Sequence, residues 1–492
     1  MTLFYNALFY SLKERHETFS ALLVDENGVI VETFQKLPNN FQGNKIDLNG
    51  TFVYPGFVDT HTHSFEGGLY SRAADLGNCR CLEDVYKLLQ EREPIDGIFV
   101  GYNFDENLIS EKRFPAPEEL DRIFPNAPCL IRRIDGHSVQ INSKAKKEIE
   151  QWGKIPLPEV EVYRGDWNDH ISRWFHRNIS QEEIISAYQR AAELAILAGH
   201  TTVHTMVGDA KDDPLHYKLL QESKKKFSIE FVLYPQIFNI QKALELGAPR
   251  VGGCILADGS FGSGTAALSE PYINDPQNRG ILYKSSQEWE KFILEAHENG
   301  LQVAIHCIGD AAIKQILSLY AQAQQQNPKN IHHQIIHSEL ITDDRVIDMM
   351  KEYHVAAVMQ PVFDLLWGGE DKLYAHVIGK DRALQCNRFR SLLAKNVLVT
   401  GGSDWYVTEM NALKGIYGAV NHHNTTERID PFAALSLYTI NAARLINEDE
   451  NVGMLTPGRK ADLVCLDRDL LQNDDILSIK ITRVVKAGKI IH

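Results

Sequence analysis

The sequence predicts an α/β fold in which a (β/α)8 barrel is joined to a small β-domain built by both ends of the chain. Eight short apolar runs with β-type composition recur along the middle of the 492-residue chain. Several of these runs are separated by segments with helical periodicity, which is typical of parallel β/α units. Eight such units are the number that closes a barrel of this kind.

The two ends of the chain are both strand-like. Residues 20–34 read SALLVDENGVIVETF, and their apolar runs flank Asn27-Gly28, a turn pair that accepts positive φ and predicts a hairpin. Near the other end, residues 461–467 and 481–492 are also strand-like. Because an isolated hairpin is barely stable, we expect residues 1–54 and 448–492 to form one domain. Two independent appendages are the alternative.

The barrel is predicted to span residues 55–447. Its eight expected strands lie within residues 52–63, 201–206, 228–237, 250–259, 302–309, 333–339, 355–361 and 396–404. Helical periodicity precedes the second and the fifth of these runs and also follows the fifth, at residues 181–199, 286–300 and 310–326.

The distance between the first and second runs is far longer than one helix requires. Residues 65–180 are therefore predicted to be an insertion. Because it follows the first strand, the insertion would lie above the end of the barrel where catalysis takes place. We interpret it as a lid or a substrate-shaping segment, with plain decoration as the alternative.

Composition narrows the classes of function. The chain is 44% hydrophobic and 24% charged, and its formal net charge of −14 makes a nucleic-acid partner unexpected. We expect no membrane partner, because the N-terminus lacks a secretory signal pattern and no apolar run approaches the roughly 18 residues of a membrane helix. Seven cysteines, an odd number, predict reduced thiols and a cytoplasmic protein.

Polar residues stand at the ends of several predicted strands. His61 and His63 end the first run and share one strand face, because side chains alternate along a strand. A lone His-x-His motif is weak evidence, since ordinary surface or hydrogen-bonded histidines fit it too. Three further runs, however, end in His306, His337 and Asp404. Because the carboxyl ends of barrel strands meet at one mouth, the pattern predicts a shared metal site.

The other histidines are predicted to be structural. His332 and His333 begin a strand, and His422-His423 lie in a loop, so neither pair stands at a carboxyl end. His204 lies within a predicted barrel strand, where we expect it to pack.

The sequence resembles the amidohydrolase superfamily, and most closely its family-3 branch, which includes N-substituted formamide deformylase. The resemblance covers nearly the whole chain. It is carried by PGFVDTHTH (55–63), RRIDGHSVQINSKA (132–145), LADGSFGSGTAALSEPY (256–272), VAIHCIGDAAI (303–313), GGSDW (401–405) and TPGRKADLVCLD (456–467). It implies a (β/α)8 barrel with a composite β-sandwich made from both termini.

The resemblance also implies ligand roles. His61 and His63 would bind one metal, and His306 and His337 a second. Asp404 would bind the first metal and shuttle the proton. Many superfamily members carry a carboxylated lysine at the end of strand four, which bridges the two metals; here Cys254 takes that place.

A cysteine cannot be carboxylated as a lysine can, so Cys254 departs from the family pattern. A Cys254 thiolate can itself bridge two cations, because Zn²⁺ takes thiolate readily. Alternatively, the site holds one metal and Cys254 is a small buried residue, or the chain has lost activity. We favour the bridge, because Cys254 lies on the strand and at the step where the bridging residue is expected.

These residues predict a metal-dependent hydrolase that cleaves a C–N bond in an amide or an N-acyl or N-formyl amine. The expected cofactor is a divalent metal, Zn²⁺ before others, as one or two ions. Asp404 can accept a proton from the water and return it to the leaving nitrogen. The expected partner is a small-molecule substrate, and the sequence leaves open whether the chain forms a homo-oligomer.

Three residues are predicted to contact the substrate. His137 lies in the motif DGHSVQIN of the insertion, with a buried hydrogen-bonded histidine as the alternative. Gln360 and Trp405 stand at the ends of the seventh and eighth runs. The glycine-rich residues 257–268 lack the lysine of a phosphate loop, so we expect them to shape the substrate pocket.

Two other functions fit the same scaffold. A deaminase of this fold carries a glutamate shortly after the strand-five histidine, but His306 is followed by Cys-Ile-Gly-Asp, and Glu339 follows the sixth run instead. A non-catalytic scaffold would have lost metal ligands, whereas this chain keeps all four histidines and the aspartate.

Overall fold

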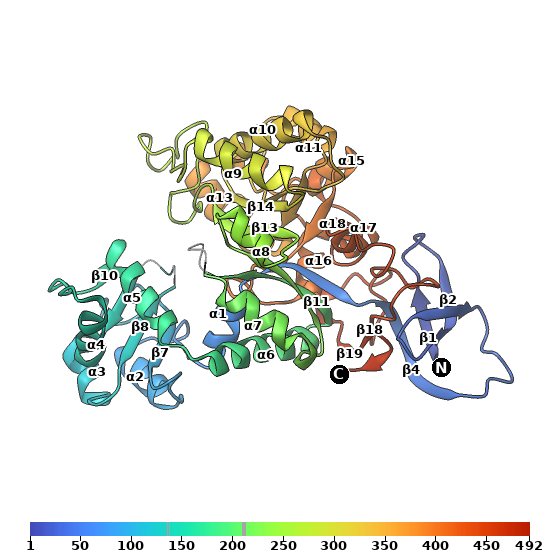
Figure 1. Ribbon diagram of the computed structural model, residues 1–492, viewed down its shortest axis with the longest axis horizontal. Helices are drawn as coiled ribbons and strands as arrows, with labels where there is room; N and C mark the ends of the chain where they lie inside the picture. Colours follow the sequence, from blue (N-terminus) through green and yellow to red (C-terminus); the bar gives the residue numbers. More distant parts are fainter. Residues whose placement is uncertain (135, 137, 209–212) are drawn as a thin grey trace. The chain divides into compact units, whose positions relative to one another are not determined.

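The computed structural model describes residues 1–134, 136, 138–208 and 213–492, and it has a mixed α/β fold. The chain divides into two compact units, residues 1–63 with 192–492 and residues 64–191 (Figure 1). Each unit contains its own β-sheet and its own hydrophobic core.

In the larger unit, both ends of the chain contribute to one seven-stranded sheet with the order β20-β19-β18-β4-β1-β2-β3. Strand β4 joins the two ends, because it pairs in parallel with β1 and antiparallel with β18. The predicted hairpin is confirmed: β2 and β3 pair antiparallel, and Gly28 in their turn has a φ of +79°. The strands are β1 Thr2–Tyr10, β2 Thr18–Val24, β3 Ile30–Phe34, β4 Asn44–Pro55, β18 Leu463–Leu466, β19 Ile481–Lys486 and β20 Lys489–Ile490.

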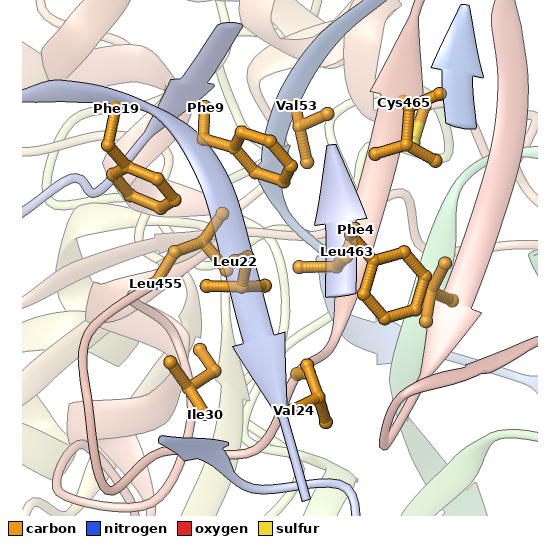
Figure 2. Close-up of a cluster of buried hydrophobic side chains, with 13 residues drawn as sticks. Phe4, Phe9, Phe19, Leu22, Val24, Ile30, Val53, Leu455, Leu463 and Cys465 are labelled. Atoms are coloured by element: carbon orange, nitrogen blue, oxygen red, sulfur yellow. The ribbon is translucent and has the colours of Figure 1, made fainter. Parts of the chain in front are cut away.

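A hydrophobic core packs on this sheet (Figure 2). Phe4, Val53 and Leu463, from β1, β4 and β18, are fully buried in it. The rings of Phe9 and Phe19 stack with their centroids 5.0 Å apart. Because the core draws apolar side chains from both ends of the chain, neither terminal hairpin has to bury its apolar face alone.

Among the described residues of the larger unit, eight strands pair in parallel in the orders β12-β11-β5 and β13-β14-β15-β16-β17. Each overlaps one of the eight predicted runs. Strand β12 contacts β13, and Thr62 at the end of β5 forms a parallel bridge with Trp405 beyond β17. The strands are β5 Phe57–Thr62, β11 His200–Val207, β12 Glu230–Pro235, β13 Arg250–Leu256, β14 Gln302–Cys307, β15 Gln334–His337, β16 Ala356–Met359 and β17 Val399–Gly401.

Helices follow these strands, and Figure 1 shows α9, α10 and α11 on the outer side of β13 and β14. Helix α9 begins at a capping box in which Ser285 N–H donates to Glu288 and Glu288 N–H donates to Ser285. The helices of this unit are α7 Leu215–Ser223, α8 Ile240–Glu245, α9 Ser286–Glu298, α10 Asp310–Gln326, α11 Asp344–Glu352, α12 Pro361–Trp367, α13 Leu373–Ile378, α14 Lys380–Ala383, α15 Phe389–Ala394, α16 Ala412–Val420, α17 Pro431–Leu437 and α18 Ile440–Leu445, with 3₁₀ turns η1 Lys224–Lys226, η2 Thr425–Glu427 and η3 Ile476–Ser478.

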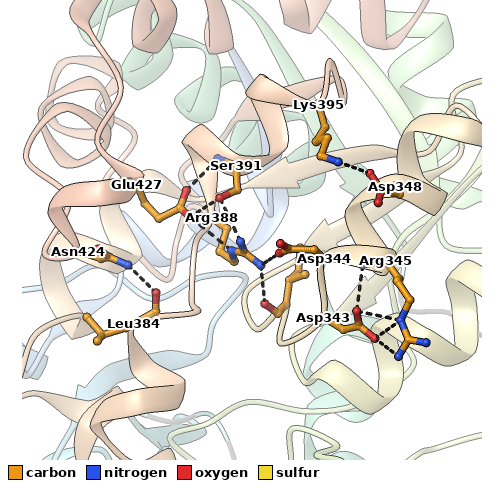
Figure 3. Close-up of polar contacts among 11 residues, drawn as sticks. Asp343, Asp344, Arg345, Asp348, Leu384, Arg388, Ser391, Lys395, Asn424 and Glu427 are labelled. Atoms are coloured by element: carbon orange, nitrogen blue, oxygen red, sulfur yellow. Dashed lines mark hydrogen bonds and ion pairs between the residues drawn. The ribbon is translucent and has the colours of Figure 1, made fainter.

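A polar network ties three of these elements together (Figure 3). Arg388, just before α15, donates to Asp344 of α11 at 2.6 Å and lies 3.4 Å from Glu427 of η2. Glu427 also accepts from the Ser391 N–H at 2.9 Å. The Glu427 carboxylate is buried, and these donors compensate its charge.

Residues 64–191 form a five-stranded sheet with the order β10-β9-β8-β7-β6. Its core includes Leu82 and Val85 of α2, Leu120 of α3, and Cys129 and Ile131 of β8. The strands are β6 Ala74–Asp75, β7 Phe99–Phe104, β8 Cys129–Arg133, β9 Ser138–Ile141 and β10 Tyr163–Arg164. The helices are α1 Ser64–Tyr70, α2 Leu82–Gln90, α3 Pro117–Ile123, α4 Ser143–Gly153, α5 Asp166–Arg177 and α6 Gln181–Leu197, whose last residues belong to the larger unit.

Within the described part of the chain, none of the helices is both long and apolar enough to cross a membrane. All seven cysteines lie in that part, and all seven carry free thiols, as the sequence predicted.

Candidate metal centre

The six residues that the sequence predicts as metal ligands lie at the carboxyl ends of parallel strands in the larger unit. His61 lies in β5 with His63 just beyond it, and Cys254 lies in β13. His306 lies in β14, His337 ends β15, and Asp404 follows β17. Because parallel strands end at the same edge of a sheet, their terminal side chains converge.

The geometry brings all six residues together. Asp404 Oδ1 lies 3.2 Å from Nε2 of both His61 and His63. The ring centroids of His61 and His337 are 5.4 Å apart, and those of His306 and His337 are 4.4 Å apart. The imidazoles of His61, His63 and His306 lie close enough to the Cys254 thiol to act on its charge.

Backbone contacts hold the first and last of these strands in register. The Asp404 N–H donates to the His61 carbonyl at 2.9 Å, and the His63 N–H donates to the Trp405 carbonyl at 2.5 Å. Asp404 and His337 adopt left-handed backbone conformations, with φ of 56° and 71°. Non-glycine residues adopt this conformation at a cost, and such strain clusters at functional sites.

Neighbouring groups orient two of the imidazoles. His337 Nδ1–H donates to Gln360 Oε1 at 2.7 Å, which leaves the lone pair of this neutral ring on Nε2. His306 Nε2–H donates to the Gly259 carbonyl at 3.2 Å, so Nδ1 is the nitrogen of this ring that could bind a metal in place of its proton. Histidine ligands of metals are oriented in this way by a hydrogen bond from the second ring nitrogen.

The pKa values describe a cluster of opposite charges. Burial opposes ionisation of Cys254, but the surrounding imidazoles, His63 foremost, hold the pKa of its thiol well below the usual range. Burial likewise disfavours the Asp404 carboxylate, but His61 and His63 hold its pKa well below the ordinary value. The pKa of His306 rises to about 9, because its contact with Cys254 outweighs burial. Burial and the nearby His306 keep the pKa of His337 well below the ordinary value.

This donor set fits a divalent cation. Imidazole nitrogen, thiolate sulfur and carboxylate oxygen are the ligand atoms that Zn²⁺ takes in proteins. Both ring nitrogens of His61, Nδ1 of His306 and Oδ1 of Asp404 are buried without a hydrogen bond of acceptable geometry. A cation would satisfy these atoms and replace the protons that the imidazoles otherwise hold.

Two overlapping ligand groups occur in the described part of the chain. His61, His63 and Cys254 form one, and His61, His337 and Asp404 form the other, with ligand atoms within 4.8 Å of one another in each. His306 belongs to neither group at that distance, but it contacts both Cys254 and His337.

A third group, Asp364 with His422 and His423, is only partly paired: the His423 N–H donates to Asp364 Oδ2 at 2.9 Å, but Nε2 of both rings lacks a hydrogen bond of acceptable geometry. His422 Nδ1 accepts the Asn424 N–H at 2.9 Å, so the proton of this ring lies on Nε2, 3.1 Å from Asp364 Oδ1. A metal on that Nε2 would leave the ring without its proton, whereas ligating histidines normally donate from the other nitrogen.

The residues predicted to contact substrate have different surroundings. Gln360 is buried against His337, and the Trp405 side chain is partly buried against a hydrophobic cluster that includes Val203 and Met410. His137 lies outside the described residues. Substrate contact by these three residues therefore stays a prediction.

Sequence reasoning missed two buried carboxylates beside the site. Asp59 accepts from the His61 N–H at 3.2 Å and the Ser403 N–H at 3.0 Å. Asp258 accepts from three backbone N–H groups, those of Ala267, Ile308 and Gly309. Both aspartates lie within motifs that carried the resemblance, but their partners come from distant segments of the chain.

The chain belongs to the amidohydrolase family, whose model matches residues 45–492. It is 27% identical to YtcJ of Bacillus subtilis (strain 168), covering 100% of this chain and 99% of that one. It is 30% identical to LONG AFTER FAR-RED 3 of Arabidopsis thaliana, over 86% of this chain and 79% of that one. N-substituted formamide deformylase of Arthrobacter pascens is 22% identical over 86% of this chain and 85% of its own length.

The fold is shared with a crystal structure described as an uncharacterized metal-dependent hydrolase from Pyrococcus horikoshii OT3. The two have a TM-score of 0.83 and 23% identity, and the match covers 100% of both chains.

Proposed function

We propose that this chain is a metal-dependent hydrolase that cleaves a C–N bond in an amide or an N-acyl or N-formyl amine. The observation that carries the proposal is the convergence of four imidazoles, one thiol and one carboxylate at the carboxyl ends of parallel strands. Membership of the amidohydrolase family supports it. The similarity to N-substituted formamide deformylase favours an N-acyl amine over other C–N substrates.

The proposal also includes the division of the chain into domains. Residues 55–447 would close into a (β/α)8 barrel, and the contact between β12 and β13 and the Thr62–Trp405 bridge support that closure. Residues 1–54 and 448–492 would form a composite β-sandwich, supported by their shared sheet. Residues 65–180 would be an insertion that shapes access to the substrate. Composition supports a cytoplasmic protein with a small-molecule substrate and without nucleic-acid or membrane partners.

We assign the metal ligands as His61, His63, Cys254, His306, His337 and Asp404. Cys254 would bridge two Zn²⁺ ions as a thiolate, and its lowered pKa supports this role. A single-metal site with Cys254 as a bystander is the alternative. With either number of metals, Gln360 would orient the His337 ring by accepting the hydrogen bond from its Nδ1.

A bound divalent cation would lower the pKa of a water molecule from about 15.7 to about 7 and polarise a substrate carbonyl. Asp404 is the residue that moves the proton. Its Oδ1 faces His61 and His63, which leaves Oδ2 to accept a proton from the attacking water. The carboxylate is ionised at neutral pH, in agreement with its low pKa, so Oδ2 has a lone pair to accept that proton. Return of the proton from Oδ2 to the nitrogen lets the amine leave, and the acyl group departs as an acid.

The test is a substrate screen on the Zn²⁺-loaded protein. N-formyl and N-acyl amines are offered, and release of amine is measured separately from release of ammonia. Metal-dependent amine release is the expected result. Ammonia release without amine release would instead identify a deaminase, and a protein that binds no metal by elemental analysis would be a non-catalytic scaffold.

A further inference from the structure

One arginine of the smaller unit is buried without a counter-ion. Arg132 lies in β8, and the residue is 7% exposed. Its Nε and Nη2 atoms have no hydrogen-bond partner, and none of the described carboxylates forms an ion pair with it. Burying an unpaired charge costs several kcal/mol, so an uncompensated guanidinium in a fold needs an explanation.

The described side chains that contact Arg132 carry no negative charge, and Tyr70 lies within electrostatic range of both Arg132 and Glu66. Cys129 and Ile131 of β8 belong to the core on one face of the sheet, and because side chains alternate, Arg132 points to the other face. There its Nη1 donates to Ser172 Oγ of α5 at 2.9 Å, and its guanidinium carbon lies 5.9 Å from the centre of the Phe175 ring. The Ser172 hydroxyl already donates to the Asn168 carbonyl, so it supplies an acceptor but no negative charge.

The neighbouring residue in β8, Arg133, shows how the charge of an arginine in this sheet can be compensated. Arg133 donates from Nε to both carboxylate oxygens of Glu106, at 2.9 and 3.1 Å, and its Nη2 lies 3.7 Å from Asp105. Two acids therefore neutralise Arg133, whereas Arg132 has none among the described residues. The contrast is local, because both arginines belong to one strand.

The two unpartnered nitrogens of Arg132 are adjacent on one edge of the guanidinium. Nε and Nη2 present parallel N–H groups that match a pair of oxygens on a carboxylate or a phosphate. The remaining nitrogen, Nη1, is held by Ser172, which limits rotation of the group. We propose that Arg132 is an anion-recognition residue that binds a carboxylate or phosphate group through Nε and Nη2.

Thermal unfolding of the full-length, metal-loaded protein tests this proposal without any knowledge of the substrate. Without added anion, Arg132→Met is expected to unfold at the same temperature as wild type or higher, because it removes an unpaired buried charge. Addition of benzoate or inorganic phosphate, against chloride at equal ionic strength, is expected to raise the unfolding temperature of wild type but not of Arg132→Met. A variant that unfolds at a markedly lower temperature in chloride would show that Arg132 is structural and would overturn the proposal.

Two further variants test whether anion binding needs the paired N–H groups of Arg132 or only its positive charge. Arg132→Lys keeps the charge but loses the paired N–H groups, so we expect at least about tenfold weaker anion binding. Arg133→Gln is the matched control, and its anion binding should equal that of wild type. Equal anion binding by wild type and Arg132→Met would contradict the proposal.

The source of the anion is decided by a second measurement, which rests on the proposed function. N-formylphenylalanine and N-formylphenethylamine differ by one carboxylate. If the anion is part of the substrate, Arg132→Met raises KM for the former at least about tenfold and leaves KM for the latter unchanged. If it is a free anion, both KM values stay unchanged while the thermal shift is still lost. Failure of both substrates to react would contradict the proposed function only, because the thermal measurement does not depend on turnover.

Discussion

Two groups of buried histidines in the larger unit differ in what their ring nitrogens contact. His297 and His333 lie 2.8 Å apart, from His297 Nδ1 to His333 Nε2. The outer nitrogens are also paired, because His297 Nε2 donates to the Asn327 carbonyl and His333 Nδ1 accepts the Val303 N–H. In the candidate metal centre, by contrast, His61 has no hydrogen bond of acceptable geometry at either ring nitrogen.

The difference separates structural histidines from ligands. Burial lowers the pKa of His333 to about 3, so this ring is neutral and fully satisfied. Burial would lower the pKa of His61 too, but Asp404 and Cys254 raise it above the ordinary value. A buried histidine is thus a candidate ligand when unpartnered nitrogens converge on anionic groups, and residue type alone does not decide it.

The largest expected effect comes from Asp404. Asp404→Asn should lower kcat by about 10²- to 10⁴-fold, because the amide cannot accept the proton from water. The assay is amine release at saturating substrate, with kcat corrected for bound metal.

Asp364→Asn is the matched control for this change, since Asp364 is a buried carboxylate that also contacts two histidines. It should lower stability but leave metal content unchanged. If both variants lost metal and activity to the same extent, the two clusters would not differ as described.

Cys254 distinguishes a bridged site from a single-metal site. Cys254→Ser is expected to reduce bound Zn²⁺ from two ions to one, because the bridging thiolate is lost. Elemental analysis of protein purified in excess Zn²⁺ measures this. Cys307→Ser is the control, because burial raises the pKa of the Cys307 thiol and it lies outside the ligand set. Unchanged stoichiometry in Cys254→Ser would remove the bridge.

Gln360 tests whether the orientation of His337 matters. Gln360→Leu removes the acceptor for His337 Nδ1, and we expect the metal affinity to fall about 10- to 100-fold. Competition with a chelator measures the affinity. Gln360→Glu keeps an acceptor and should retain most of it. Equal loss in both variants would point to packing instead.

The smallest expected effect is on the free energy of unfolding at acidic pH. The folded pKa of His333, about 3, lies below its unfolded value of about 6.5. Its contribution to stability is therefore complete above pH 6.5 and is lost as the pH falls toward 3. At pH 5 the loss is about 2 kcal/mol.

Urea unfolding at pH 7.5 and pH 5 measures this contribution. His333→Asn should be less stable at pH 7.5 but should lose less stability on acidification. Substitution of the exposed His16 by Asn should leave the pH dependence as in wild type. A His333→Asn protein with the wild-type dependence would assign acid sensitivity to other groups.

Much of the site could be predicted because its signals are local. An apolar run that ends in a histidine or an aspartate marks a strand end, and this rule found His61, His306, His337 and Asp404. The five-stranded sheet of residues 64–191 was not predicted beyond an insertion. Two of its strands, β6 and β10, have only two residues each, which is too short for an alternating pattern.

Other features depended on contacts between distant segments. Gln360 was predicted to touch substrate, which stays a prediction, but the hydrogen bond that it accepts from His337 on the neighbouring strand was not predicted. The role of Asp258 also escaped prediction, because its three N–H donors come from Ala267, Ile308 and Gly309. Such pairings require the register between strands and the direction of each side chain, which no single segment contains.

The sequence by itself determined which residues stand at the ends of the parallel strands, because strand formation follows from local runs of apolar and β-branched residues. Only the tertiary structure decided which ring nitrogens find a partner and which stay open, because those partners lie on strands far apart in the chain. The same distinction separates Arg132 from Arg133: they are neighbours in sequence, and the folded sheet places two carboxylates beside one of them.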